Sequence, residues 1–147
     1  MDQFIGTMPV VEKQRFDVAR LENYLRAHVE GFSGALEVEQ FKGGQSNPTY
    51  RLSAGGKRYA MRAKPGPAAK LLPSAHAIER EFRVISALGR TDIPVPRTYA
   101  LCEDEGVIGR AFYVMDCVEG RVLWDQSLPG MSKAERGAIY DEMNRVI

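Results

Sequence analysis

The sequence predicts an α+β fold: an antiparallel sheet of five strands with one helix packed on it, preceded in the chain by an N-terminal helix. Three observations favour this class. Short segments that alternate apolar and polar residues recur along the chain, as in half-buried strands. Glycine-rich turns too short to hold a crossover helix join several of them, which favours antiparallel pairing. Two longer segments carry apolar residues at helical spacing, which gives the order helix, three strands, helix, two strands.

The first helix is expected to begin after Asp17 and to end near Gly31. An aspartate side chain accepts hydrogen bonds from the first helical amides, and glycine commonly follows the last helical turn. Apolar residues recur at helical spacing between these positions at Val18, Leu21, Leu25 and Val29. Residues 1–16 carry few structural signals and are expected to form an arm that leads into the helix.

Three strands are expected next, over residues 36–41, 49–53 and 57–63. A dense turn sequence, Gly43-Gly-Gln-Ser-Asn-Pro48, separates the first two strands. Gly55 and Gly56 separate the second and third, as in a tight hairpin whose two central residues need positive φ.

The second helix is expected to have Ser74 as its N-cap and Gly89 just past its end. Its apolar face is formed by Ile78, Phe82, Ile85 and Leu88. The last two strands are expected over residues 99–103 and 111–118.

A further helix is expected to begin at Ser132, because Ser132 and Glu135 have the spacing of a capping box. The chain finishes on the apolar residues Val146 and Ile147. We therefore expect it to be the front part of a longer protein. A terminal helix packed on the domain is the alternative.

Composition and charge exclude several classes of protein. The apolar share of 44% and the charged share of 27% are ordinary for a globular domain of 147 residues. A net charge of +1 is too small to attract nucleic acid, and no apolar run is long enough to span a membrane. The two cysteines make no disulfide framework, neither histidine has a partner at metal-ligand spacing, and no signal peptide is present. We therefore expect a cytoplasmic protein with no metal-ligand set in this chain, no nucleic-acid partner and no membrane partner.

The turn from Gly43 to Asn47 is the first candidate for a binding site. Glycines let the backbone approach a ligand closely, and successive amides in such a turn can bind an anion. Ser46 and Asn47 add side-chain donors. The turn matches neither Gly-x-Gly-x-x-Gly nor the Walker A motif, and most such turns serve only as turns.

Three further segments carry candidate groups. A period of two places Ala60 and Arg62 on one face of their strand, which leaves room for a flat ring beside a positive charge. Glu81 flanks the buried stripe of the second helix and could reach a cation on a neighbouring strand. The last strand leads into Gly120, and free backbone groups beside apolar residues suit the edge of a purine. Taken singly, a solvated arginine, a solvated glutamate and an ordinary core strand are the simpler interpretations.

In this order, the segments resemble the small lobe of the aminoglycoside phosphotransferase and choline kinase-like family. The resemblance is closest to the branch fused to, or encoded near, acyl-CoA dehydrogenases. It is carried by residues 40–50, 71–82 and 108–115, within residues 36–120. It implies a protein kinase-like N-terminal lobe at residues 36–118. The arm and first helix would occupy residues 1–35, and a linker with the first helix of a C-terminal lobe would occupy residues 119–147.

The resemblance also implies how ATP would bind. The glycine turn would fold over the triphosphate, and Arg62 would bind the α- and β-phosphates at a position where most kinases have lysine. Lys64, on the same face of the strand, is the reserve candidate for this base. Glu81, rather than Glu79, would orient Arg62 through an ion pair. The residues implied for nucleotide binding are Gly43, Gly44, Gln45, Ser46, Asn47, Ala60, Arg62, Glu81, Met115, Asp116 and Val118. Of these, Ala60 and Met115 would pack around the purine, and the backbone of Asp116 and Val118 would contact its edge.

The catalytic loop of the family, a His-Gly-Asp run followed five residues later by Asn, does not occur in the sequence. The resemblance therefore implies that the catalytic base and the Mg²⁺ ligands lie beyond Ile147, and that this chain alone is an inactive, ATP-binding lobe of a small-molecule kinase. Its partners would be ATP with Mg²⁺, the missing C-terminal lobe, and a small hydroxylated substrate of the aminoglycoside, choline or hydroxyacyl type. The alternative is a non-catalytic α+β binding module or a degenerate kinase relic.

Overall fold

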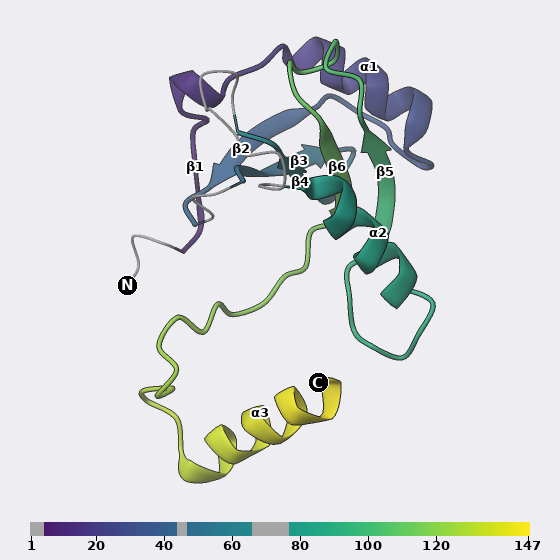
Figure 1. Ribbon diagram of the computed structural model, residues 1–147. Helices are drawn as coiled ribbons and strands as arrows, with labels where there is room; N and C mark the ends of the chain where they lie inside the picture. Colours follow the sequence, from purple (N-terminus) through teal and green to yellow (C-terminus); the bar gives the residue numbers. More distant parts are fainter. Residues whose placement is uncertain (1–4, 44–46, 66–76) are drawn as a thin grey trace.

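The computed structural model describes residues 5–43, 47–65 and 77–147, and its fold is of the expected α+β class. One antiparallel sheet, in the order β1-β2-β3-β4-β6-β5, carries helix α1 on one face and helix α2 on the other (Figure 1). The strands are β1 (Thr7–Met8), β2 (Glu37–Phe41), β3 (Thr49–Ala54), β4 (Lys57–Ala63), β5 (Thr98–Cys102) and β6 (Phe112–Asp116). The helices are α1 (Val18–His28), α2 (Ile78–Leu88) and α3 (Lys133–Val146), with a short 3₁₀ helix at Glu12–Gln14.

The hairpin of β3 and β4 is formed as the two glycines predict. Gly55 and Gly56 have φ values of 56° and 76°, which the tight two-residue turn requires. The register is symmetrical about the turn, from Ala54 opposite Lys57 to Thr49 opposite Arg62. The hairpin therefore fixes which residues of β3 and β4 share a face of the sheet.

The sheet has six strands rather than five, because the N-terminal arm adds β1 along the edge of β2. Thr7 pairs with Phe41 and Met8 with Gln40. The Thr7 hydroxyl donates to Oε1 of Glu39 at 3.2 Å, which also fastens the arm. A strand of two residues has no period that could be recognised, so the sequence gives no sign of it.

Helix α1 covers the face of the sheet that holds the larger core. Asp17 caps the helix as expected, accepting a hydrogen bond from the Arg20 amide at 3.2 Å. The helix ends at His28 rather than near Gly31. The chain then turns so that Val29 and Phe32 are buried, and Gly31, with φ of 78°, serves that turn. The main buried residues of this core are Leu21, Leu25, Tyr50, Leu52, Tyr59, Met61, Phe112 and Val114.

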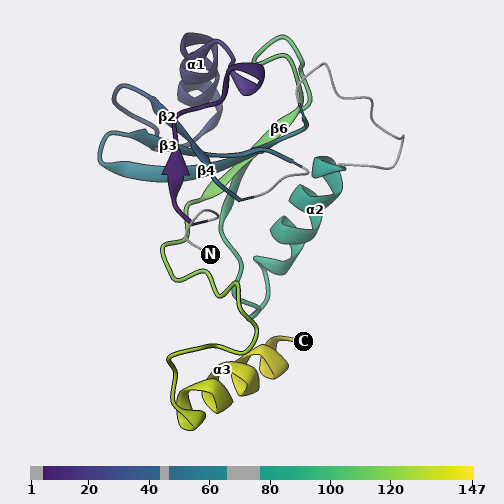
Figure 2. The same ribbon diagram turned by 90° about the vertical axis from the view of Figure 1, so that its left-hand side faces the viewer.

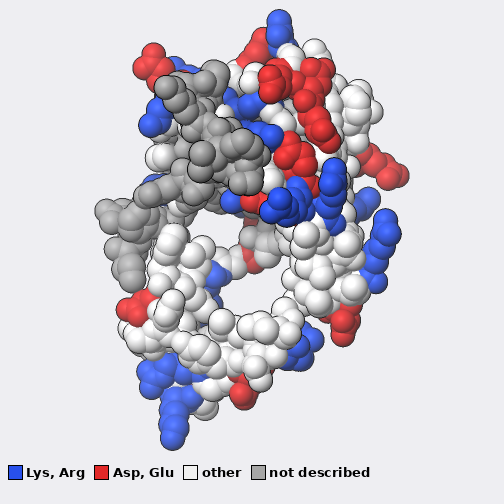
Figure 3. All heavy atoms as spheres, in the orientation of Figure 1, with Lys and Arg blue, Asp and Glu red and all other residues white. Residues whose placement is uncertain are grey.

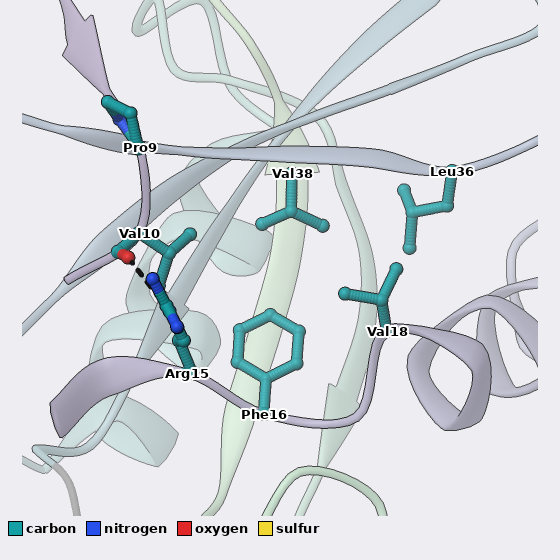
Figure 4. Close-up of a pocket in the computed structure, with 7 residues that line it drawn as sticks. All are labelled: Pro9, Val10, Arg15, Phe16, Val18, Leu36 and Val38. Atoms are coloured by element: carbon teal, nitrogen blue, oxygen red, sulfur yellow. Dashed lines mark hydrogen bonds between the residues drawn. The ribbon is translucent and has the colours of Figure 1, made fainter. Parts of the chain in front are cut away.

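A hollow of about 370 Å³ lies on the same face, between the arm, α1 and β2 (Figure 4). Its lining is mainly apolar, with Phe16 and Val38 among the residues that face it. The one cation drawn there, Arg15, donates from Nε to the Val10 carbonyl at 3.4 Å. Val38 lies opposite Leu52, which belongs to the core beneath α1, so this hollow is on the opposite side of the sheet from Arg62.

Helix α2 packs on the other face through Ile78, which is fully buried against Ala111 and Tyr113. It begins at Ile78, and the expected cap, Ser74, lies outside the described residues. Gly89 follows the helix as predicted, but its φ of −62° is right-handed. The left-handed glycine stop is unnecessary here because the amide and the hydroxyl of Thr91 both donate to the Leu88 carbonyl.

Helix α3 lies apart from the sheet, at the end of an extended segment that leaves β6 (Figures 1 and 2). Its capping box is present: the Ser132 hydroxyl accepts from the Glu135 amide, and Glu135 accepts from the Ser132 amide at 2.7 Å. No residue of α3 is buried. None of the helices in the described part of the chain combines the length and apolarity needed to cross a bilayer.

Candidate functional site

The alternation along β4 places two predicted residues on the α2 face of the sheet. Tyr59, Met61 and Ala63 point into the core beneath α1. Ala60 and Arg62 therefore point to the opposite face, as the period of two predicts. Ala60 is 5% exposed and lies opposite Met115 of β6, so a small residue occupies the centre of this face.

Arg62 and Glu81 form an ion pair between β4 and α2. Nε of Arg62 lies 2.7 Å from Oε2 of Glu81, with each side chain about one third exposed. Glu81 reaches the strand because it flanks Ile78, the residue that anchors α2 to the sheet. The Tyr113 hydroxyl, on the strand beside Arg62, also donates to Glu81. Burial and the Glu81 charge both raise the pKa of Tyr113, so it remains a donor.

A second ion pair runs beside the first. Nζ of Lys64 lies 2.7 Å from Oε1 of Glu79, so each cation at this end of β4 has its own acidic partner on α2. Burial tends to raise the pKa of the Glu79 carboxyl, but the hydrogen bond from Lys64, a backbone hydrogen bond and the charges of Lys64 and Arg83 together hold the pKa below its usual range. The structure thus pairs Arg62 with the glutamate that the sequence analysis preferred, and Lys64 with the other.

The glycine turn is described at its two ends only, since Gly44, Gln45 and Ser46 lie outside the described residues. Gly43 lines a second hollow, which lies on the α2 face of the sheet. Asn47 is 3% exposed, and within the described part of the chain its Oδ1 atom has no hydrogen-bond partner.

A hollow of about 660 Å³ lies between this face of the sheet and the segment that leaves β6. Its volume is within the range of small-molecule sites, roughly 300–1,000 Å³. Figure 3 shows an opening between the sheet and α3, with acidic and basic side chains interspersed along its upper rim. The lining residues are Ile5, Gly6, Phe41, Gly43, Thr49, Arg51, Arg58, Arg62, Cys117, Val118, Glu119, Gly120, Val122 and Trp124.

The predicted residues are only partly brought together by this hollow. Gly43, Arg62 and Val118 line it, although they come from three distant parts of the sequence. The Asp116 side chain points to the opposite face, where it accepts a hydrogen bond from the Tyr99 hydroxyl. The Asp116 side chain therefore does not face the hollow. Whether these residues bind a nucleotide stays a prediction.

Arg51 and Arg58 also line the hollow, and neither is among the site residues predicted from the sequence. Arg51 is paired with Glu39, and Nη1 of Arg58 lies 3.0 Å from Oε1 of Glu119. The hairpin register could have identified them from the sequence. Counting outward from the Gly55-Gly56 turn places Arg51 opposite Ala60 and Ser53 opposite Arg58. Both arginines therefore share the face of Ala60 and Arg62.

The remaining chemistry-bearing residues have structural explanations. Nδ1 of His28 lies 2.9 Å from the Tyr24 carbonyl, and its ring stacks on Tyr24, whereas His76 is outside the described residues. Burial raises the pKa of the Cys117 thiol in spite of the nearby charges of Arg51 and Arg58, so the thiol is less nucleophilic than a free one. Within the ranges that the structure covers, no three Asp, Glu, His or Cys side chains gather into a metal-binding group.

Comparison with known proteins gives consistent results. Residues 37–147 match the model of the phosphotransferase enzyme family. Acyl-CoA dehydrogenase family member 11 of Rattus norvegicus is 44% identical over 95% of this chain, and that of Gallus gallus is 47% identical over 92%. A crystal structure of a presumed aminoglycoside phosphotransferase from Ralstonia eutropha is 65% identical over 90% of this chain, with a TM-score of 0.76. The chain spans 18% of the length of either relative and 37% of the solved chain.

Proposed function

The chain belongs to the phosphotransferase enzyme family, and from that membership we propose that it is the ATP-binding lobe of a small-molecule kinase. The observation that carries this proposal is the Arg62–Glu81 ion pair at the wall of a hollow of about 660 Å³. A cation fixed by an acidic partner in a cavity of this size suits a bound polyphosphate. In the proposed reaction, the γ-phosphate of ATP moves to the oxygen of a metabolite hydroxyl, ADP leaves, and the hydroxyl proton is lost to a base.

In this proposal, Arg62 binds the α- and β-phosphates. A guanidinium stays charged at all relevant pH values and can donate two parallel hydrogen bonds to phosphate oxygens. Glu81 holds the side chain of Arg62 in place, so that less conformational freedom is lost when the nucleotide binds. The glycine turn that begins at Gly43 would add backbone amides over the phosphates.

The purine would lie farther along the same face, toward the end of β6. Ala60 leaves room for a flat ring there, with Met115 beside it. The backbone of Asp116 and Val118 would provide donors and acceptors for the edge of the base. The Asp116 side chain is held on the other face by Tyr99 and its amide donates to the Arg97 carbonyl, so the carbonyl oxygen of Asp116 is the group proposed for this contact.

Mg²⁺ does not fit the described residues of this chain, since no acidic cluster is found among them. We propose that the metal ligands and the catalytic base belong to a second lobe, which would follow this chain in the full-length protein. The chain alone would then bind ATP without transferring phosphate at a useful rate. The reaction would take place in the cytoplasm, where free thiols such as Cys102 and Cys117 persist.

The proposed acceptor is an alcohol of a small metabolite, of the aminoglycoside, choline or hydroxyacyl type. The names of the relatives, which are acyl-CoA dehydrogenase family members, favour the hydroxyacyl type. Family membership transfers the reaction more safely than the substrate. A panel of these three acceptors, assayed by ADP release from the full-length protein, would choose among them.

The test of the nucleotide site compares Arg62→Ala with Lys64→Ala in the full-length protein. We expect Arg62→Ala to weaken Mg·ATP binding by about tenfold or more, since hydrogen bonds to charged groups are worth about 1.5–3 kcal/mol. The Lys64 variant should bind ATP almost as well as the wild type. A larger loss in Lys64→Ala would make Lys64 the phosphate-binding base. No ATP affinity in the wild-type protein would favour a non-catalytic binding module or a degenerate relic instead.

A further inference from the structure

Arg51 lies next to the position proposed for the purine. It is directly opposite Ala60 in the β3–β4 pair, and Arg51, unlike Ala60, is among the residues that line the hollow of about 660 Å³. Directly opposite residues in an antiparallel pair have Cβ atoms about 4.5–5.5 Å apart. A flat ring packed against Ala60 would therefore also meet the side chain of Arg51.

The orientation of Arg51 is fixed by Glu39. Glu39 is the neighbour of Arg51 in the β2–β3 register, and its Oε2 atom accepts from Nε of Arg51 at 3.0 Å and also from Nη2. The second oxygen of Glu39 accepts from Thr7 of β1. Two donors of Arg51 are thus held by one carboxylate that is itself anchored, and this guanidinium is more restrained than a solvated one.

Arg51 and Arg62 are drawn apart across the sheet. Glu39 lies on β2, on one side of the β3–β4 hairpin, whereas Glu81 lies on α2, which packs on β6 and β5 on the other side. The two cations therefore leave Ala60 between them. The charge of Arg51 also reaches Cys117, where it opposes the rise in thiol pKa that burial causes. Arg51 thus lies between β2 and the segment proposed to read the purine edge.

We propose that Arg51 is a base-contact residue, whose guanidinium lies against the face of the purine beside Ala60 and is held there by Glu39. This inference rests on the proposed nucleotide-binding function. Guanidinium groups stack on aromatic rings, and the attraction grows when the pair is removed from water. Glu39 takes the hydrogen bonds of Nε and Nη2, so the flat face of the guanidinium, rather than this hydrogen-bonding edge, would meet the ligand. The occupant of this part of the hollow is therefore an aromatic base, and Arg51 selects nucleotides over other polyphosphates.

The test separates the base from the phosphates by using two probes on the full-length protein: Mg·ATP and Mg·tripolyphosphate. Both affinities are measured by calorimetry for the wild type and for Arg51→Met, which keeps an apolar stem without the guanidinium. We expect Arg51→Met to weaken ATP binding by about tenfold and to leave tripolyphosphate binding unchanged. The unchanged tripolyphosphate affinity also reports that the variant is folded. Arg51→Lys, which keeps the charge but not the plane, should behave like Arg51→Met.

The matched control is Arg58→Met, which removes the same charge from the same hollow. Arg58 lies opposite Ser53 and not opposite Ala60, so the ratio of the two affinities should stay at the wild-type value. Equal losses for both probes in Arg51→Met would show a phosphate contact, and no loss for either would show that Arg51 does not touch the ligand. Either result overturns the inference. A wild-type protein that binds neither probe, or an Arg62→Met variant that binds both normally, would instead contradict the proposed function.

Discussion

The hydroxyl group of Tyr113 donates a 3.0 Å hydrogen bond to Oε2 of Glu81, the same oxygen that lies 2.7 Å from Nε of Arg62. Tyr113 is almost fully buried and lies directly opposite Arg62 in the β4–β6 pair. One carboxylate oxygen therefore connects α2 to two adjacent strands. The position of the glutamate is set by the tyrosine as well as by the arginine.

Replacing Tyr113 with phenylalanine tests this arrangement. Tyr113→Phe removes the hydrogen bond and keeps the ring in the core, so we expect a loss of about 1 kcal/mol in the free energy of unfolding. Glu81 still holds Arg62 in this variant, and ATP affinity should change by about threefold or less. Urea unfolding and nucleotide titration measure the two effects. A large loss of ATP affinity at unchanged stability would mean that Tyr113 meets the ligand itself.

Replacing Glu81 with glutamine tests the ion pair. Glu81→Gln keeps the shape of the side chain and removes its charge, so Arg62 is no longer held in one orientation. We expect turnover by the full-length protein to fall about tenfold, a change of about 1.4 kcal/mol in the barrier. Steady-state kinetics with a responsive acceptor provide the measurement.

The matched control for this variant is Glu79→Gln, which makes the same substitution on the same helix but affects Lys64. Its turnover should stay within about twofold of the wild type. Equal losses in the two variants would indicate that α2 has shifted as a whole, and the specific role of the Arg62–Glu81 pair would have to be abandoned.

Much of the sheet could be predicted from the sequence because its signals are local. The Gly55-Gly56 turn determines the β3–β4 register, and the alternation in β4 then places Ala60 and Arg62 on one face. Helix α2 could be oriented as well, because Ile78 marks its buried side. From these two elements alone, a contact between β4 and Glu81 of α2 can be expected.

The remaining features depend on contacts that are distant in the sequence. β1 forms only because residues 7 and 8 meet the edge of β2, and two residues carry no pattern. The hollow includes Trp124 and Gly43 together, and no local signal relates the turn to the segment after β6. The end of α1 was also placed too late, because the helix stops at His28 and Gly31 takes its positive φ in the turn that follows.

The two hairpin glycines differ in how closely the loop at Ser33 approaches them, and this difference can be tested. A Cβ atom on Gly55 would lie 2.6 Å from the carbonyl oxygen of Ser33, whereas a Cβ on Gly56 would meet nothing within 4 Å. Both glycines have positive φ, which costs roughly 1–2 kcal/mol for alanine. We expect Gly56→Ala to lower the free energy of unfolding by about that amount and Gly55→Ala to lower it further. Equal losses in urea unfolding would show that the loop at Ser33 gives way without cost.

The Lys64–Glu79 ion pair predicts a pH dependence of stability. The folded-state pKa of Glu79 is lowered from its usual value of 4.5, because the hydrogen bond and charge of Lys64, with smaller help from a backbone hydrogen bond and Arg83, outweigh the effect of burial. A lowered folded-state pKa means that the unfolded chain takes up the proton first as the pH falls. The stabilisation from Glu79 is therefore complete well above pH 4.5 and is lost as the pH falls below 4.5 through the folded-state value.

Glu79→Gln measures this contribution. At pH 7 the variant should be less stable than the wild type by about 0.5–1 kcal/mol, the upper part of the range for partly exposed pairs. The difference should shrink toward zero as urea unfolding of the 147-residue chain is repeated from pH 7 down to pH 3. In a Lys64→Met background, where the partner is missing, the same substitution should cost less at pH 7 and show a weaker dependence on pH. A difference that stays constant across this range would mean that Glu79 stabilises the helix by packing, and not through its charge.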